Sequence, residues 1–370
     1  MTVICNTKEL YEAIANVSKA VFEKSTILAL EGIKVNVKNS SIELTGYDLE
    51  IGIQTEISAR TTDRGQFIIN PRLLGEIVRK MDSEEVTLEV LGNQQIRVVG
   101  GETEYTVMIM GAEEFPSLPQ KENDCESITI SQSVLKNMIY QTVFAVSQTD
   151  NKPILKGELF EFDNNTFHMV AIDGYRLAIR KETVKYSGTT SFVVPAKALN
   201  EISKLLKDDD ELNCDIYVSK KHALFEFSGY TVYSRLLEGE FHNWRGSLPE
   251  NSVTEVIVDR KDLIQSLERA SILINERVKS PVRCIFEGDE LSLSCSTSIG
   301  KISDKIPMDC TGPVIEIGFN CKFFLDPLKV ISDDKVKLLL NGSTLPMKIK
   351  SLSSDAYTFL VLPVRLKASE

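Results

Sequence analysis

The pair Tyr-Thr, which occurs three times in this chain, gives the clearest indication of how it folds. The three pairs begin at Tyr105, Tyr230 and Tyr357, at nearly equal intervals, and no other Tyr-Thr pair exists. Two helical segments precede each pair in the same order, with apolar residues recurring on one helix face. A recurrence of this kind with a period of about 125 residues predicts an internal threefold repeat.

An acidic turn and a β-rich run follow the helical segments in every copy. We expect helices over residues 8–24, 71–81, 133–147, 196–207, 261–277 and 321–330. Short β-rich runs separated by Asn-Ser, Gly-Asn or Gly-Gly turns predict hairpins around these helices. Each repeat therefore consists of a strand, a helix and three strands, twice over. Two helices cannot cover both faces of two antiparallel sheets, so we predict an α+β fold with the helices gathered on one side.

Two segments rich in Pro, Ser, Asn and Glu interrupt this pattern, one after each of the first two Tyr-Thr strands. Their composition is typical of linkers between domains. We therefore expect three domains, over residues 1–122, 126–246 and 252–370.

The composition is that of an ordinary globular protein, with 42% hydrophobic and 26% charged residues. No apolar stretch reaches the roughly 18 residues that a membrane span needs, and the N-terminus lacks the pattern of a signal peptide. We therefore expect a cytoplasmic protein without a membrane partner. The seven cysteines are scattered and never spaced Cys-x-x-Cys, which favours reduced, buried thiols over disulfides or a zinc site.

The net charge of −11 argues against nucleic-acid binding when it is taken over the whole chain. The charge is unevenly distributed, however, because Lys and Arg outnumber Asp and Glu over the six expected helices. A basic helical surface on an acidic protein would attract DNA at that surface alone. A lysine-bearing helix is more often a solvated face, so charge by itself does not decide between the two interpretations.

The sequence contains no recognisable catalytic motif. Its three histidines lack metal-ligand spacing, and no Gly-rich phosphate loop, GxSxG or HExxH motif occurs. The acidic run Asp208–Glu211 has the composition of a two-metal nuclease site, but Asp82 and Asp333 stand at the same place in the other repeats, directly after a helix. We interpret the run as a solvated turn and expect neither catalytic residues nor a metal or cofactor. A metal-dependent nuclease and a repeat scaffold that does not bind DNA remain the alternatives.

Three such repeats, the stretch AIDGYRLA in the second repeat and the ending LPVRL together resemble the bacterial DNA polymerase III beta subunit, the sliding clamp. The resemblance covers the whole chain. It implies three similar domains, two chains joined head to tail in a ring around double-stranded DNA, and a non-catalytic processivity factor for DNA replication. Helices would line the hole, and the outer sheets would join edge to edge.

The size of such a ring can be checked independently of the resemblance. A domain of about 120 residues has a diameter of roughly 35 Å. Three such domains in a ring would enclose a hole of only about 5 Å, and six would enclose one of about 35 Å. The DNA duplex is roughly 20 Å wide. Only a homodimer of this chain would therefore admit DNA.

The resemblance also implies which residues contact DNA and the second chain. The DNA-facing positions are Lys24, Arg72, Thr149 and Lys197. Thr149 departs from the well-known enteric member, which carries Gln there. Contacts of this kind involve phosphates rather than bases, so binding would be independent of DNA sequence. Ile272 and Leu273 match an apolar dimer contact of the family.

A hydrophobic cleft is the last feature that the resemblance implies, and it would bind short linear motifs of the DNA polymerase III alpha subunit, the clamp loader and repair polymerases. Its matching positions are Leu155, Gly174, Tyr175, Arg176, Leu177, His242, Thr344, Pro346, Val361, Leu362, Pro363, Val364, Arg365 and Leu366. We expect Arg176 and Arg365 to edge the cleft with their guanidinium groups in water. Leu362 and Val364 replace Met residues of the enteric clamp, and His242 replaces its Pro, which leaves the peptide preference open. The alternative is that the C-terminal run is simply a core strand.

Overall fold

The computed structural model describes residues 1–119, 121, 127–149, 151–274 and 280–366. The chain divides into two compact units. The first unit comprises Met1–Lys136 with Glu201–Leu236, and the second comprises Asn137–Asn200 with Leu237–Glu370. Among the helices of the described part, none combines the length and the apolar character needed to cross a membrane.

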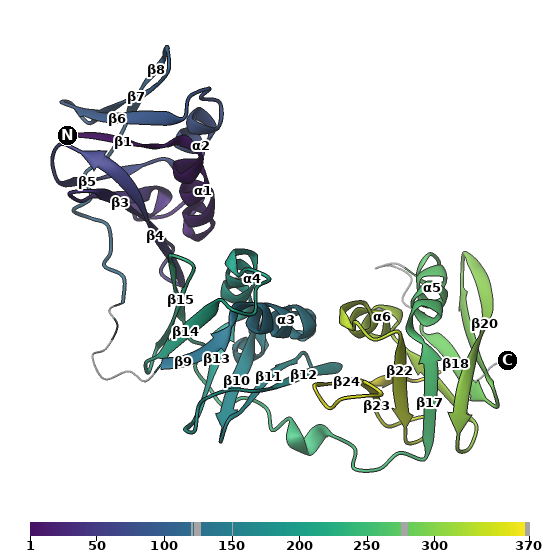
Figure 1. Ribbon diagram of the computed structural model, residues 1–370. Helices are drawn as coiled ribbons and strands as arrows, with labels where there is room; N and C mark the ends of the chain where they lie inside the picture. Colours follow the sequence, from purple (N-terminus) through teal and green to yellow (C-terminus); the bar gives the residue numbers. More distant parts are fainter. Residues whose placement is uncertain (120, 122–126, 150, 275–279, 367–370) are drawn as a thin grey trace. The chain divides into compact units, whose positions relative to one another are not determined.

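The first unit is built on a 12-stranded antiparallel sheet (Figure 1). Its strands are β1 (Thr2–Asn6), β2 (Ile33–Val37), β3 (Ser41–Tyr47), β4 (Ile51–Thr61), β5 (Gly65–Ile69), β6 (Glu85–Leu91), β7 (Gln95–Gly100), β8 (Thr103–Met108), β9 (Ser127–Ser131), β14 (Asn213–Val218), β15 (His222–Phe227) and β16 (Tyr230–Arg235). They follow the order β8-β7-β6-β1-β4-β16-β15-β14-β9, while β3 pairs with β4 and β2, and β2 pairs with β5.

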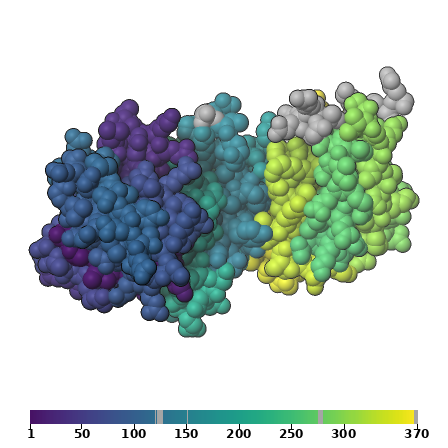
Figure 2. All heavy atoms as spheres, turned by 90° about the horizontal axis from the view of Figure 1, so that it is seen from above, coloured from purple at the N-terminus to yellow at the C-terminus, as the bar shows by residue number. Residues whose placement is uncertain are grey.

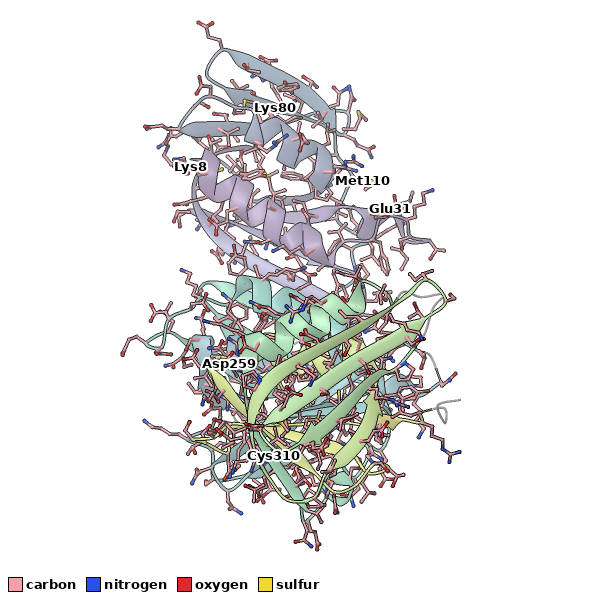
Figure 3. All side chains as sticks on the ribbon, turned by 90° about the vertical axis from the view of Figure 1, so that its right-hand side faces the viewer. Lys8, Glu31, Lys80, Met110, Asp259 and Cys310 are labelled. Carbon is pink, nitrogen blue, oxygen red and sulfur yellow. The ribbon has the colours of Figure 1, made fainter. Side chains whose placement is uncertain are left out.

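Helices α1 (Thr7–Val17) and α2 (Pro71–Arg79) of the first unit pack against each other. The start of α1 lies beside the end of α2, near Lys8 and Lys80 (Figure 3). Helices α3 (Gln132–Thr142) and α4 (Ala196–Leu205) each have residues in both units.

The second unit is built on a 13-stranded antiparallel sheet. Its strands are β10 (Gly157–Asp163), β11 (Thr166–Ile172), β12 (Arg176–Thr183), β13 (Thr189–Pro195), β17 (Thr254–Asp259), β18 (Val282–Glu287), β19 (Glu290–Thr297), β20 (Gly300–Thr311), β21 (Ile315–Phe319), β22 (Lys335–Leu340), β23 (Met347–Lys350), β24 (Tyr357–Val361) and β25 (Pro363–Val364). Their order is β13-β10-β11-β12-β24-β23-β22-β17-β20-β19-β18-β21-β25. Helices α5 (Arg260–Ser271) and α6 (Cys321–Val330) pack against each other beside β17 and β22 (Figure 1).

Four of the helices begin directly after a strand, at a residue whose side chain caps the helix. Asn6, Asn70, Asp259 and Asn320 accept hydrogen bonds from backbone N–H groups of the first helical turn. Such caps satisfy donors that have no partner within the helix. The sequence repeat is therefore present in the structure as a recurring unit of strand, cap and helix.

The first helix of each repeat is shorter than predicted. α1 ends at Val17, α3 at Thr142 and α5 at Ser271, and residues 275–277 of the fifth expected helix lie outside the described residues. Near each end a hydroxyl side chain bonds to a backbone carbonyl one turn earlier: Ser18 to Ile14, Thr142 to Met138 and Ser271 to Glu268. Such bonds offer the backbone an alternative to continuing the helix. Lys24 consequently lies in an exposed loop rather than on a helix.

The Tyr-Thr pairs and the acidic run lie where the repeat predicts them. The pairs fall in β8, β16 and β24. Asp208–Glu211 forms an exposed turn between α4 and β14, which confirms its interpretation as a turn. Among the described residues, no group of three or more His, Cys, Asp or Glu side chains is placed to hold a metal ion.

The described cysteines are free, and nearly all are buried, as predicted. Buried thiols are Cys5, Cys214, Cys284, Cys295 and Cys321, whereas Cys310 is half-buried. Burial raises the pKa of the Cys321 thiol to about 12, so that it stays protonated. Cys125 lies outside the described residues.

Among the described residues, two apolar clusters of the second unit bear on the cavities described below. The larger includes Phe286, Phe319 and Phe324, from β18, β21 and α6. The smaller packs around Trp244, the single tryptophan of the chain, with apolar residues of β10 to β13 and Leu360 of β24. Figure 2 shows the green and yellow segments of this unit packed into one continuous body. These two clusters hold the walls of those cavities.

Candidate partner-binding cleft

The apolar run near the C-terminus changes character in its middle. Strand β24 pairs with β12 in antiparallel register, with Tyr357 opposite Arg180 and Val361 opposite Arg176. Val361 is 0% exposed, whereas the next residue, Leu362, is 38% exposed. Tyr357–Val361 is therefore a core strand, and the sequence from Leu362 onward reaches the surface. The core-strand interpretation is correct for Tyr357–Val361, and the cleft interpretation stays a prediction for the residues from Leu362 onward.

A cavity of about 640 Å³ opens beside Leu362. We call it the linker cavity, because residues of the second linker segment, 241–252, form one of its walls. It is lined by Lys152, Ile154, Leu155, Ile172, Gly174, Arg176, Leu177, Glu240, Phe241, His242, Asn243, Ser247, Pro346, Leu360 and Leu362. Half of the predicted cleft positions are in this lining. The volume lies within the range of small-ligand and peptide side-chain pockets.

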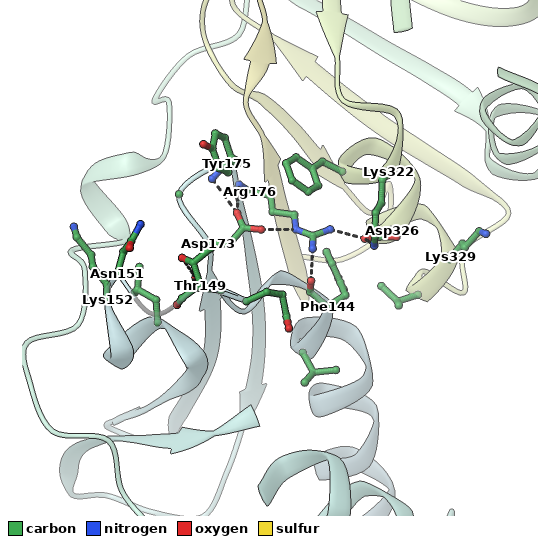
Figure 4. A pocket seen from close by; sticks show the side chains of 17 residues that line it. Phe144, Thr149, Asn151, Lys152, Asp173, Tyr175, Arg176, Lys322, Asp326 and Lys329 are labelled. Atoms are coloured by element: carbon green, nitrogen blue, oxygen red, sulfur yellow. Dashed lines mark hydrogen bonds and ion pairs between the residues drawn. The ribbon is translucent and has the colours of Figure 1, made fainter. Parts of the chain in front are cut away.

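A second cavity of about 1000 Å³ adjoins the first, and we call it the arginine cavity (Figure 4). It is lined by Val143, Phe144, Ser147, Gln148, Thr149, Asn151, Lys152, Leu155, Asp173, Gly174, Tyr175, Arg176, Lys322, Phe323, Asp326, Lys329 and Val330. The two linings share Lys152, Leu155, Gly174 and Arg176. The shared residues make the cavities neighbouring compartments of one candidate cleft.

Arg176 is the central residue of the arginine cavity, and its position corrects the expectation of a wet guanidinium group. The side chain is only 7% exposed. Its guanidinium group donates to Asp173 at 2.9 Å, to Asp326 at 2.5 Å and to the Phe144 carbonyl oxygen at 2.5 Å (Figure 4). The Phe323 ring lies 4.6 Å from it. The Phe144 ring lies 5.3 Å from it. Two carboxylates and these two aromatic rings take the place of water around the charge, because a buried arginine requires such partners.

The turn before β12 is set by Asp173 and Gly174. Asp173 accepts hydrogen bonds from the backbone N–H groups of Tyr175 and Arg176, at 2.9 and 3.0 Å. Gly174 has φ of +89°, a conformation that glycine adopts without steric cost. The turn leaves the Tyr175 carbonyl oxygen free to accept from the Leu362 N–H at 2.9 Å. The exposed Tyr175 ring stacks on Phe323, with ring centroids 5.8 Å apart.

The other predicted cleft residues lie outside both cavity linings. They are Thr344, Val361, Pro363, Val364, Arg365 and Leu366. Thr344, Val364 and Arg365 are exposed, Val361 is buried in β24, and Pro363 and Val364 pair with β21 at Phe319 and Gly318. The cleft role of these residues remains a prediction.

Sequence reasoning missed several residues that shape the cleft. Phe144, Phe323, Lys322 and Asp326 line the arginine cavity, and Phe241 and Asn243 line the linker cavity. The signal for Asp173 was its position three residues before Arg176 in the stretch DGYR, where a carboxylate can pair with the arginine. The signal for Asp326 was a lone carboxylate within the apolar helix FFLDPLKV, which is unusual unless the charge is paired.

The residues predicted to contact DNA and a second chain are accessible. Lys24 and Arg72 are exposed in the first unit, and Thr149 and Lys197 are exposed in the second. Ile272 is 77% exposed, directly after α5. The adjacent Leu273 is half-buried, so one of the two side chains is available to a neighbouring chain, as their adjacent positions predict.

Comparison with known proteins places the whole chain in one family. The family models for the DNA polymerase III beta subunit match residues 1–119 (N-terminal domain), 129–243 (central domain) and 245–365 (C-terminal domain). The beta sliding clamp of Bacillus subtilis is 34% identical over 96% of this chain and 97% of its own length. That of Staphylococcus epidermidis strain RP62A is 32% identical, over 94% of each chain.

Solved structures agree with the sequence matches. The DNA polymerase sliding clamp of Bacillus subtilis superposes with a TM-score of 0.96 at 31% identity, covering 99% of this chain and 100% of the other. The DNA polymerase III beta subunit of Thermotoga maritima gives 0.91 at 25% identity, with 99% and 100% covered.

The repeat, the fold and these matches define a DNA sliding clamp, which confirms the predicted fold class and function. The chain belongs to the DNA polymerase III beta subunit family. Members of this family are non-catalytic processivity factors, so the chain is not an enzyme.

Proposed function

We propose that two copies of this chain join head to tail in a ring around double-stranded DNA, in the cytoplasm. The ring tethers the DNA polymerase III alpha subunit, the clamp loader and repair polymerases, which bind the cleft through short linear motifs. Each copy contributes three domains, over residues 1–122, 126–246 and 252–370. The observation that supports a closed ring is the way in which the three Tyr-Thr strands pair with other strands.

Two of these strands join a repeat to the preceding one in the same register. β16 pairs with β4, placing Tyr230 opposite Thr55, and β24 pairs with β12, placing Tyr357 opposite Arg180. Thr55 and Arg180 hold equivalent positions in their repeats, about 125 residues apart. The residues before Thr55 in β4 are largely buried under this pairing, and so are those before Arg180 in β12.

The third Tyr-Thr strand, β8, and the third acceptor strand, β20, each have an open edge among the described residues. β8 pairs only with β7, and Gly300 to Lys305 of β20 pair only with β19. Both segments are exposed or half-buried, unlike their equivalents. Open edges of this kind can pair with another chain. Continuing the period places Tyr105 of one copy opposite Lys305 of the other.

The size of the hole requires these edges to meet between two copies rather than within one. Three domains of this size would enclose a hole of about 5 Å, too narrow for the duplex. Contacts from Lys24, Arg72, Thr149 and Lys197 to phosphates would guide the ring without reading sequence. Retention would then come from topology rather than from tight binding, which leaves the clamp able to slide.

The mass of the protein in solution tests this proposal first. We expect sedimentation to give twice the 41.4 kDa of one chain. The double variant Ile272→Ala and Leu273→Ala should give folded monomers, because it removes the apolar contact beside the open edge. A dimer of unchanged strength in that variant would refute the assignment of these two residues.

Retention on DNA separates the clamp from the two alternatives. After loading, the protein should stay on closed circular DNA and leave the same DNA once it is cut to a linear form. A scaffold would be retained on neither form. A nuclease would degrade both when Mg²⁺ is added.

A further inference from the structure

The wall of the linker cavity that comes from the second linker is not part of the sheet. Phe241, His242, Asn243 and Ser247 contribute this wall. Upstream of it, the Leu237 N–H donates to the Val193 carbonyl oxygen at 3.0 Å. No regular strand or helix covers residues 236–244. The position of the wall therefore depends on side-chain anchors rather than on a hydrogen-bonded ladder.

Trp244 is the principal anchor of this wall. Its side chain is 6% exposed and packs in the smaller core against Leu159, Val170 and Leu360. The indole N–H donates to the Glu161 carboxylate at 3.1 Å. A buried indole of this kind contributes a large apolar surface and one directional hydrogen bond.

Arg245 covers the solvent side of the Trp244 ring. Its guanidinium group lies 4.1 Å from the centre of the Trp244 ring and forms an ion pair with Glu161 at 2.6 Å. Glu161 thus holds both Trp244 and Arg245, and we call these three residues the tryptophan latch. Burial raises the pKa of the Glu161 carboxyl, but the hydrogen bonds from Arg245 and Trp244 outweigh it and lower the pKa.

His168 packs beside the tryptophan latch. It stands opposite Glu161 on β10 and opposite Lys181 on β12, and its ring lies 5.3 Å from that of Trp244. Its Nδ1 atom is buried and has no hydrogen-bond partner among the described residues. Burial, followed by the charge of Arg245, lowers the pKa of this imidazole, which favours an uncharged ring against the indole.

The latch fixes the cavity wall through the backbone that connects them. The Ser247 N–H donates to the Trp244 carbonyl oxygen at 3.1 Å, and Ser247 Oγ lies 2.9 Å from His242 Nε2. His242 and Ser247 line the cavity, whereas the three latch side chains do not belong to the lining that the described residues form. A displacement of Trp244 would therefore move the wall residues on both sides of it.

We propose that the tryptophan latch is a positioning element of the partner cleft, which sets the affinity for a bound apolar peptide without touching it. The inference rests on the proposed cleft function. It adds that Glu161, Trp244 and Arg245, which lie outside the described cavity lining, control the width of the linker cavity. Opening the latch releases the wall and removes the preformed shape on which tight binding depends.

The test combines peptide affinity with the emission of the single tryptophan. The probe is a synthetic peptide without tryptophan in which a glutamine precedes a short run of leucine and phenylalanine. Glu161→Ala should shift the Trp244 emission to the red and weaken peptide binding in calorimetry about tenfold. Glu161→Gln should retain blue emission and most of the affinity, because the amide oxygen still accepts from the indole N–H.

Arg283→Ala is the matched control, since it removes a half-buried arginine that pairs with Glu316 at 3.1 Å on other strands of the same unit. It should change neither emission nor affinity. Red-shifted emission of Glu161→Ala with unchanged affinity would overturn the proposal, as would equal loss of affinity in Arg283→Ala. If the unaltered protein did not bind the peptide at all, the proposed cleft function would fail instead.

Discussion

The guanidinium group of Arg176 and the carboxylate of Asp326 lie 2.5 Å apart and connect the second repeat to the third. Arg176 opens β12, and Asp326 lies within α6. Both side chains are largely buried, and Asp173 holds the same guanidinium group from the other side at 2.9 Å. The ion pairs thus support the wall between the two cavities of the cleft.

Arg176→Ala should destabilise the second unit strongly. Removing the guanidinium group leaves Asp173, among the described residues, with backbone N–H donors alone and Asp326 with the exposed Lys322 alone. Breaking a buried ion pair by removing one partner costs about 3–5 kcal/mol. Arg176→Lys should restore little of this, because an ammonium group lacks the planar fork that binds two carboxylates and a carbonyl at once. Chemical denaturation provides the measurement, with Arg283→Ala as the control, because Arg283 is only half-buried and its ion-pair partner is exposed. Equal unfolding free energies for both alanine variants would contradict the buried network.

Removing Leu362 to Glu370 should affect recognition more than folding. The deletion leaves β24 intact up to Val361, so the paired core strand remains. It removes Leu362 from the linker cavity. We expect a folded dimer that still closes around DNA but no longer binds the glutamine-led apolar peptide. A shorter deletion, of Lys367 to Glu370, is the control and should bind normally. Retained peptide affinity in the longer deletion, or collapse of its melting transition, would refute the cleft role of Leu362.

Glu158 should make the second unit less stable as the pH rises. Its carboxyl is fully buried in β10, and burial raises its pKa to about 8. Thr142 Oγ1 donates to a Glu158 carboxyl oxygen, which lowers the pKa of this carboxyl, but burial outweighs the bond. The other carboxyl oxygen of Glu158, Oε1, has no hydrogen-bond partner in the part of the chain that the structure describes.

The sign of this pH dependence follows from the raised pKa. The folded state holds a proton that the unfolded state loses above the ordinary carboxyl pKa. The contribution of Glu158 to stability is therefore largest below that ordinary pKa and falls as the pH rises to about 8, by up to about 1.4 kcal/mol per pH unit. Glu158→Gln should therefore gain in melting temperature relative to the unaltered protein at pH 8 more than at pH 5. The exposed Glu287→Gln is the control. A difference independent of pH would show that Glu158 is not the titrating group.

The register proposed between two copies can be trapped by cysteine pairs. Tyr105 opposite Lys305 also places Val107 opposite Ser303, on the same face of the joined sheets. Val107→Cys combined with Ser303→Cys should form a disulfide-linked dimer on oxidation, visible by denaturing electrophoresis. Val107→Cys with Asp304→Cys should not, because adjacent strand residues point to opposite faces. Efficient crosslinking of the second pair alone would indicate a different register.

Lys24→Ala, Arg72→Ala and Lys197→Ala should each weaken retention of the loaded clamp on DNA slightly and reduce its dependence on salt. Each would remove one of the proposed phosphate contacts and the counterion release that accompanies it. Retention on closed circles of different sequence, measured over a range of salt concentrations, is the appropriate assay. Strong dependence on DNA sequence would contradict a lining that contacts phosphates.

Features set by local pattern were predictable from the sequence, and features set by distant partners were not. The repeat, six helices and the place of each Tyr-Thr strand followed from periodic spacing. That one residue of the pair Ile272 and Leu273 is exposed followed from their adjacent positions, since both side chains cannot lie on one helix face. The helix ends at Ser18 and Thr142 were misplaced because the competing bond is made by a side chain within an otherwise helical pattern. The burial of Arg176 depends on Asp326, about 150 residues away, which no local pattern reveals.

The repeated pairing of β16 with β4 and of β24 with β12 has a consequence for how a ring of this kind opens. Within one chain, the linker keeps both strands of such a joint near each other at any dilution, so these joints close again after every opening. The proposed joint between β8 and β20 of different copies would use the same geometry but would depend on protein concentration. A tandem fusion of two copies would make one of these two joints permanent as well. It would leave a single gate, through which DNA would have to enter and leave.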